Sequence, residues 1–363
     1  MTSAFELLGV PLKNRNKTHL IEMLRCATKL EHATLPPYLT AMWSIKNQKH
    51  PAYKILRSIV YEEMCHMGTA CNILTTIGEI PSLSDKDFIP IYPTRLPCGI
   101  VPKVIPPNVP QWKVGLSRLT PAVVSDVFMI IEYPEKGPVQ TIEFAGKKPT
   151  RRFHTIGEFY DAIAETLAFL VKAGRVHITG QKQLSEPFVG HDENHQNVLK
   201  PITTLDEALT AIEHIKEQGE GTPSTPDAPL FGGELAHYYK FKQIQVGRLF
   251  AQVADGSWTL SGSFFDFPEV WPMADVPAAG YDTPPAPVAA LLTKFKQDYD
   301  HLLLSLQSAW KKGGDAGGQD DLNAAEDTMR GLRGTATSLM GIAIDESGDL
   351  SKKGTYGPLF RVS

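Results

Sequence analysis

Two short segments decide the fold: EEMCHM at residues 62–67 and ELAHYY at residues 234–239. Each contains the pattern Glu-x-x-His, as Glu63-Met-Cys-His66 and as Glu234-Leu-Ala-His237. A spacing of three places the carboxylate and the imidazole on one helical face, about one turn apart, so that both can reach one cation. In di-iron carboxylate bundles, two helices each supply this pair and the other two each supply a single Glu. The repeated motif therefore predicts an all-α four-helix bundle around two metal ions.

The spacing of apolar residues places both motifs on helices. Residues 18–47 and 52–78 repeat apolar positions every three or four residues. Only about four residues separate these segments, so they should pack as an antiparallel hairpin. Further helices are predicted over 155–172, 204–218, 232–253, 286–312 and 321–341, with a short one around 120–132.

Pro36 and Pro37 interrupt the first of these helices. Each proline removes an amide donor and crowds the preceding turn, so the helix must kink there. The kink frees the carbonyls of His32 and Ala33, right beside Glu31. We expect Glu31 to be a metal ligand, because it lies on the apolar stripe and level with Glu63 across the hairpin.

A single Glu-x-x-His would be weak evidence, since eleven histidines give roughly one such pair by chance. Both pairs here lie on otherwise apolar stripes, where an unpaired carboxylate costs several kcal/mol of desolvation. This context favours a buried metal site over surface or core pairs that only bridge helices.

Two acidic residues compete for the remaining ligand position, Glu158 and Glu165 on the helix predicted at 155–172. Thr155-Ile-Gly-Glu158 also fits a capping box, which would turn Glu158 back to an amide. Glu165 lies deeper in the helix, which favours it geometrically. Glu62 is an additional ligand candidate, for which a solvated or salt-bridged role is favoured.

Other polar clusters are better explained without a metal. The residues His191, Asp192, Glu193 and His195 could bind an ion, but a polar loop is the simpler interpretation. Cys65 points about 100° away from His66 on the helix, so a buried inert thiol is expected.

Composition narrows the class of protein. The formal net charge of −4 gives no reason to expect a nucleic-acid partner, and no apolar run approaches the roughly 20 residues that span a bilayer. The four cysteines lack CxxC spacing, which predicts reduced thiols and a cytoplasmic protein.

Prolines and glycines suggest how the chain is divided. We predict a metal-binding bundle over 1–255, with a Pro-rich crossover insertion at 79–154. The segment 256–363 is predicted to be a linker and two helices that pack on the bundle, joined by a flexible Gly-rich stretch at 313–321. The apolar content of the crossover indicates that it packs over the bundle and lines a closed cavity beside the metal site.

Five further motifs resemble a known family. LEHATLPPYL (30–39), EEMCHM (62–67), TIGEFYDAI (155–163), EQGEGT (217–222) and ELAHYYKFKQI (234–244) are similar to the ferritin-like domain of the iminophenyl-pyruvate dimer synthase family. Its named members act in bisindole pathways. The resemblance implies a ferritin-like fold, and it implies that Glu158 of the IGEFY segment is a ligand. The implied ligand set is Glu31, Glu63, His66, Glu158, Glu234 and His237.

These observations lead to a functional hypothesis with one alternative. The chain is expected to be a non-haem di-iron oxidoreductase of secondary metabolism, with Mn or mixed occupancy as options for the metal. Its expected partners are O2 and a small organic molecule derived from an aromatic amino acid. No nucleic-acid or membrane partner is expected, and the chain is allowed to form a homo-oligomer. The alternative is an iron-binding or storage-like protein without an organic substrate.

Overall fold

The computed structural model describes residues 3–102, 112–134, 156–187, 198–221, 226–228, 233–254 and 256–362. Helices dominate these ranges: α1 Ala4–Gly9, α2 Lys17–Ser44, α3 Pro51–Thr76, α4 Pro121–Val123, α5 Met129–Ile131, α6 Ile156–Lys172, α7 Leu205–Glu220, α8 His237–Val246, α9 Ala286–Lys312 and α10 Gly318–Met340. A π-helical turn, Val124–Phe128, joins α4 to α5. Short 3-10 turns cover Leu12–Asn14, Pro97–Gly99 and Gly314–Ala316.

The strands form three short antiparallel pairs. β1 (Glu186–Pro187) pairs with β2 (Val198–Leu199), β3 (Asp227–Ala228) with β4 (Glu234–Leu235), and β5 (Ala251–Gln252) with β6 (Trp258–Thr259). Each pair closes a loop between helices, so the described part of the chain is all-α in architecture, as predicted.

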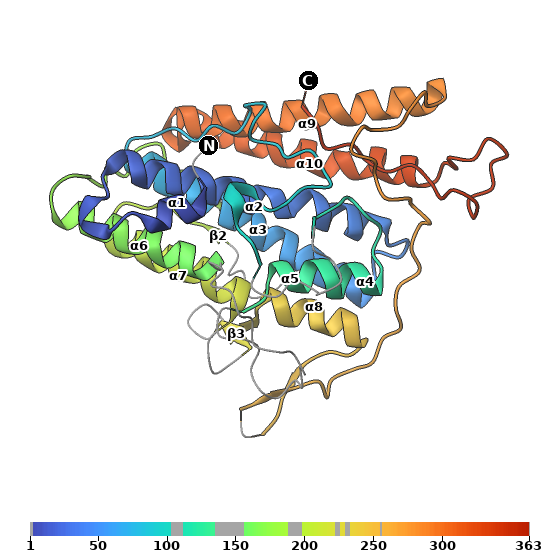
Figure 1. Ribbon diagram of the computed structural model, residues 1–363, viewed down its shortest axis with the longest axis horizontal. Helices are drawn as coiled ribbons and strands as arrows, with labels where there is room; N and C mark the ends of the chain where they lie inside the picture. The colour runs from blue at the N-terminus through green and yellow to red at the C-terminus, as the bar shows by residue number, and fades with distance from the viewer. Residues whose placement is uncertain are drawn as a thin grey trace.

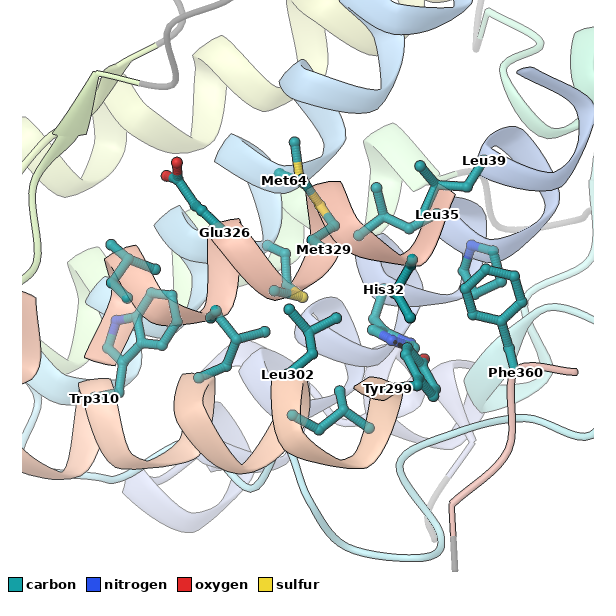
Figure 2. Close-up of a pocket in the computed structure, with 17 residues that line it drawn as sticks. His32, Leu35, Leu39, Met64, Tyr299, Leu302, Trp310, Glu326, Met329 and Phe360 are labelled. Atoms are coloured by element: carbon teal, nitrogen blue, oxygen red, sulfur yellow. Dashed lines mark hydrogen bonds between the residues drawn. The ribbon is translucent and has the colours of Figure 1, made fainter. Parts of the chain in front are cut away.

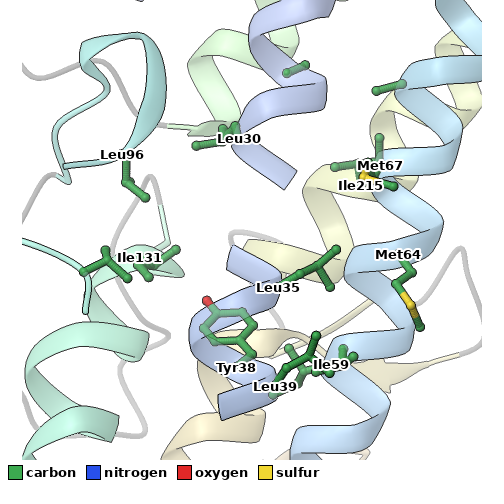
Figure 3. Close-up of a cluster of buried hydrophobic side chains, with 14 of the residues drawn as sticks. Leu30, Leu35, Tyr38, Leu39, Ile59, Met64, Met67, Leu96, Ile131 and Ile215 are labelled. Carbon is green, nitrogen blue, oxygen red and sulfur yellow. The ribbon is translucent and has the colours of Figure 1, made fainter. Parts of the chain in front are cut away.

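The helices form three layers, and the α2–α3 hairpin is the middle layer (Figure 1). α9 and α10 cover one side of the hairpin. On the other side, α6 and α7 cover one half, and α5 and α8 cover the other half. Leu35 and Tyr38 of α2 and Ile59 and Met64 of α3 belong to the buried apolar cluster of the central layer (Figure 3).

α2 continues through its two prolines, and side chains bind its backbone at the first turn and beside the prolines. Asn16 caps the first turn by accepting a bond from the amide of His19 at 3.0 Å. The hydroxyl of Tyr92, from the crossover, donates to the carbonyl of Ala33 at 2.7 Å. This carbonyl is one of the two that the sequence predicted to be freed, and Tyr92 satisfies it.

Most of the apolar side chains predicted to pack are buried in the described part of the crossover. Its side chains Phe88, Tyr92, Trp112 and Val114 are buried, whereas Ile91 is 64% exposed. Val104 and Ile105, also predicted to pack, lie outside the described residues, as do 135–155.

The helix predicted at 232–253 is shorter in the structure. α8 begins only at His237, because Gly233 has a left-handed φ of 68° and Glu234 pairs with Ala228 in a strand. Glu234 and His237 therefore do not lie on one helical face.

The prediction of a flexible joint at 313–321 is wrong. α10 begins at Gly318, and the amide of Gly314 donates to the carbonyl of Gln183 at 3.0 Å. A Cβ at Gly318 would lie 2.3 Å from the carbonyl oxygen of Ala309, so glycine allows the two helices to turn tightly.

The expectation of four reduced cysteines is also wrong, because Cys26 of α2 and Cys98 form a disulfide across 72 positions of sequence. Such a pairing has no local spacing signal and depends on the crossover folding back over α2. Cys65 and Cys71 are buried thiols outside this disulfide. No helix in the described ranges is long and apolar enough to cross a membrane.

Candidate metal centre

Two groups of buried side chains share one residue, Glu63. The first group is Glu31, Glu63 and His66, and the second is Glu63, Glu132 and His237. Within each group, one potential ligand atom from each residue lies within 4.8 Å of the others. All five residues are buried, so the groups form one cluster inside the bundle.

α2 and α3 build the first group. Glu63 and His66 are three positions apart on α3, and Glu31 approaches from α2 with its Oε2 3.5 Å from His66 Nδ1. The hydroxyl of Thr34 donates to Glu63 Oε2 at 2.8 Å, and that of Tyr160 on α6 donates to Glu31 Oε1. These hydroxyls fix the orientation of both carboxylates.

The end of α5 and the start of α8 complete the second group. His237 Nδ1 lies 2.8 Å from Glu63 Oε1 and 3.6 Å from Glu132 Oε2. The hydroxyl of Tyr38 donates to Glu132 Oε1 at 2.5 Å. The rings of His66 and His237 stack with centroids 5.5 Å apart, so the two groups are adjacent.

Both imidazoles are held through their outer nitrogens. His66 Nε2 lies 2.8 Å from Gln218 Oε1 of α7, and His237 Nε2 lies 2.7 Å from Glu62 Oε2. A bond at one ring nitrogen fixes which atom faces a metal, and here Nδ1 of each ring faces the carboxylates.

Glu62 is itself held by a buried lysine. Lys240 of α8 donates to Glu62 Oε1 and to Glu234 Oε2, the latter at 3.1 Å. Burial alone would raise the pKa of Glu62, but the charge of Lys240 and the bond from His237 lower it. The salt-bridged role favoured for Glu62 is therefore what the structure has.

Burial and neighbouring groups shift the pKa values of Glu63, His66 and His237. Burial, followed by the charge of Glu132, raises the pKa of Glu63 to about 7. Burial would lower the pKa of His237, but its bonds with Glu132, Glu62 and Glu63 raise it well above the usual value. Burial would also lower the pKa of His66, but its bond to Glu31 and the charges of Glu63 and Glu31 together raise it.

The structure brings together four of the six predicted ligands and leaves two outside the cluster. Glu31, Glu63, His66 and His237 lie in the two groups, whereas Glu158 and Glu234 do not. Glu234 is half-buried on β4 beside Lys240, and burial raises its pKa.

α6 contributes Tyr160 to the cluster in place of a carboxylate. Glu158 is half-buried in the first turn of α6, and Glu165 is exposed. Thr155 of the predicted capping box lies outside the described residues, as do His191, Asp192, Glu193 and His195.

Glu132 is the cluster residue that the sequence did not indicate. It follows the apolar run Met129–Ile131 at the end of the short α5 and belongs to no spaced motif. A carboxylate directly after a buried apolar run was the available signal, because such a group needs a partner.

The donor set is compatible with metal binding. Three buried carboxylates, Glu31, Glu63 and Glu132, converge with two imidazoles, and the nearby Lys240 is already paired with Glu62. Like charges this close in a buried site are costly unless a cation compensates them. Oxygen and nitrogen donors of this kind suit iron, manganese or zinc, and Glu63 belongs to both groups of potential ligands.

Comparison with known proteins identifies the family and the fold. The model of the ferritin-like family matches residues 24–246, which contain every residue of the cluster. The crystal structure of a ferritin-like protein from Caulobacter vibrioides superposes with a TM-score of 0.62 at 23% identity, covering 96% of this chain and 99% of that one. None of the curated proteins compared with the chain matches it. The fold, the cluster and the family match together show that the chain belongs to the ferritin-like family.

Proposed function

We propose that the protein is a metal-dependent oxidoreductase that uses a non-haem di-iron centre and O2 to oxidise a small organic metabolite. The observation that carries the proposal is the sharing of Glu63 by two buried groups, each with its own histidine. This is the arrangement in which one carboxylate serves two ions a short distance apart. The aromatic amino-acid class of substrate comes from the family resemblance in the sequence.

Each side chain has a distinct role in this proposal. Glu31 and His66 would hold one ion, Glu132 and His237 the other, and Glu63 both. A pair of iron ions held by these residues would relay electrons from the organic substrate to O2. Tyr160 orients Glu31 through its hydroxyl bond to that carboxylate.

The remaining contacts hold the second ion's ligands in place. Tyr38 orients Glu132, and Glu62 holds the ring of His237. Lys240 neutralises Glu62, so this outer carboxylate adds no net charge to the cluster.

A storage-like role is the second candidate. It would use the same ligands but needs neither a substrate nor defined stoichiometry. The enclosed position of the cluster within the bundle favours a fixed number of ions over mineral growth.

The test is to express the protein with iron, purify it anaerobically, and measure metal content and O2 consumption. We expect about two ions per chain and O2 uptake that rises on addition of an aromatic 2-oxo acid or its imine. A chain without metal under these conditions would refute both candidate functions. Metal without substrate-dependent O2 uptake would refute the enzyme and favour the storage-like role.

A further inference from the structure

A separate cavity of about 60 Å³ lies between the α2–α3 hairpin and the α9–α10 hairpin (Figure 2). Leu35 and Met64 line it from the central layer, and Leu303 and Met329 line it from the C-terminal helices. His32 and Met64 adjoin Glu31 and Glu63 in sequence, but side chains one position apart point about 100° apart on a helix. The cavity therefore lies behind the metal cluster and is a different site.

The residues that line the cavity extend along the axis of α9. Its lining residues on α9 run from Tyr299 to Trp310, which is about 16 Å along a helix axis. Figure 2 shows Trp310 at one end, and His32, Tyr299 and Phe360 at the other. An unbranched chain fits such a shape better than a ring does.

One polar atom at the His32 end has no partner. The side chain of His32 is 4% exposed, and its Nε2 is bonded to the hydroxyl of Tyr299 at 2.7 Å. Its Nδ1 has no hydrogen-bond partner among the described residues. A buried polar atom without a hydrogen bond lowers the stability of the fold. A water molecule bound there would need two to four polar partners, which the apolar walls do not offer.

We propose that the cavity binds an unbranched aliphatic molecule whose single uncharged hydroxyl group bonds to His32 Nδ1. A charged head group is disfavoured because the walls are apolar and the carboxylate of Glu326 lies at the Trp310 end. The methionines Met64, Met67 and Met329 line the cavity and can adjust their side chains to a chain of several carbons. This site goes beyond the proposed oxidoreductase activity and does not depend on it.

The test is calorimetric titration of the purified protein with 1-hexanol and with 1-chlorohexane. We expect saturable binding of 1-hexanol, and binding of 1-chlorohexane about five-fold weaker, because the halide cannot replace the hydroxyl in the bond to His32. His32→Leu should remove this preference between the two ligands.

Two alanines on α10 provide a matched pair of variants. Ala325 lines the cavity and is 1% exposed, whereas its neighbour Ala324 is exposed. Ala325→Leu fills the cavity and should weaken 1-hexanol binding by about ten-fold or more, and Ala324→Leu should leave it within about two-fold.

The outcomes separate clearly. Absence of saturable 1-hexanol binding to the wild-type protein would overturn the proposal, as would equal binding by the two alanine variants. Equal affinity for the alcohol and the chloride would overturn the role of His32. None of these outcomes bears on the metal content or the O2 uptake of the protein. The proposed function is therefore tested separately, by those two measurements.

Discussion

At the scale of single residues, Glu63 is the side chain on which both halves of the candidate centre depend. It contacts His237 through Oε1 and Thr34 through Oε2, and it belongs to both groups of potential ligands. His66 and His237 each belong to one group only. Substitution of Glu63 should therefore lower the metal content more than substitution of either histidine.

Substitutions at these positions should therefore remove different amounts of metal. His66→Ala and His237→Ala should each lower the content from about two ions to about one, and Glu63→Ala should lower it below one. Elemental analysis of iron-supplemented protein measures the content, and circular dichroism checks that helicity is retained. Cys65→Ala is the control on α3 and should retain both ions; equal loss in that variant would contradict the assignment.

The raised pKa of Glu63 predicts how the metal-free protein responds to pH. The pKa rises from its reference of 4.5 to about 7, so between these values the folded state keeps a proton that the unfolded state has lost. The free energy of unfolding should therefore fall as pH rises through this window. Glu63→Gln removes this dependence and should gain on the order of 3 kcal/mol over the wild type between pH 4.5 and 8.

Urea denaturation of both metal-free proteins at several pH values measures this gain. A difference between variant and wild type that stays constant from pH 4.5 to 8 would show that Glu63 does not titrate as described.

At the scale of elements, α10 contains two glycines in opposite situations. A Cβ at Gly318 would meet the carbonyl oxygen of Ala309 at 2.3 Å, whereas one at Gly331 would meet nothing within 4 Å. Gly318→Ala should therefore force α9 and α10 apart and destabilise the fold by about 1–3 kcal/mol. Gly331→Ala should stabilise it by up to about 1 kcal/mol, because alanine favours the helix.

Thermal or urea unfolding of the two variants compares them directly. Equal and small effects at both positions would indicate that the turn between α9 and α10 is not packed as closely as the structure has it.

At the scale of the whole molecule, the Cys26–Cys98 disulfide links the central layer to the crossover. Alkylation of the unfolded, non-reduced protein should label two of its four cysteines, Cys65 and Cys71. Mass spectrometry counts the labels, and prior reduction should raise the count to all four. Labelling of four without reduction would contradict the disulfide.

If the disulfide is present, Cys26→Ser should lower the free energy of unfolding by about 2–4 kcal/mol, because the closed loop restricts the unfolded chain. Reduction of the wild-type protein should cost a similar amount, which controls for the packing of the substituted side chain.

The enclosed cluster also predicts how much iron the whole molecule takes up. Ferrous iron in excess with O2 should load about two ions per chain and should not form a mineral core, because the ligands are buried inside one bundle. Size-exclusion chromatography with iron detection measures the loading. A stable core of many ions per chain would favour the storage-like role.

The sequence by itself determined the long helices α2 and α3 and the residues of these two helices that face inward. The positions of Glu31, Glu63 and His66 follow from helical periodicity, because α2 and α3 are long and their spacing is local. The freed carbonyl of Ala33 likewise follows from Pro37 alone.

Only the tertiary structure decided which further groups join them. Glu132 and Tyr160 reach the cluster from segments about 70 to 100 positions away from Glu63. Glu234 lies outside the cluster because it pairs in a strand after Gly233, so that α8 begins only at His237. The disulfide and the cavity behind Glu31 arise in the same way, from contacts between distant segments. Local spacing can predict a helical face, but it cannot predict which distant segment packs against that face.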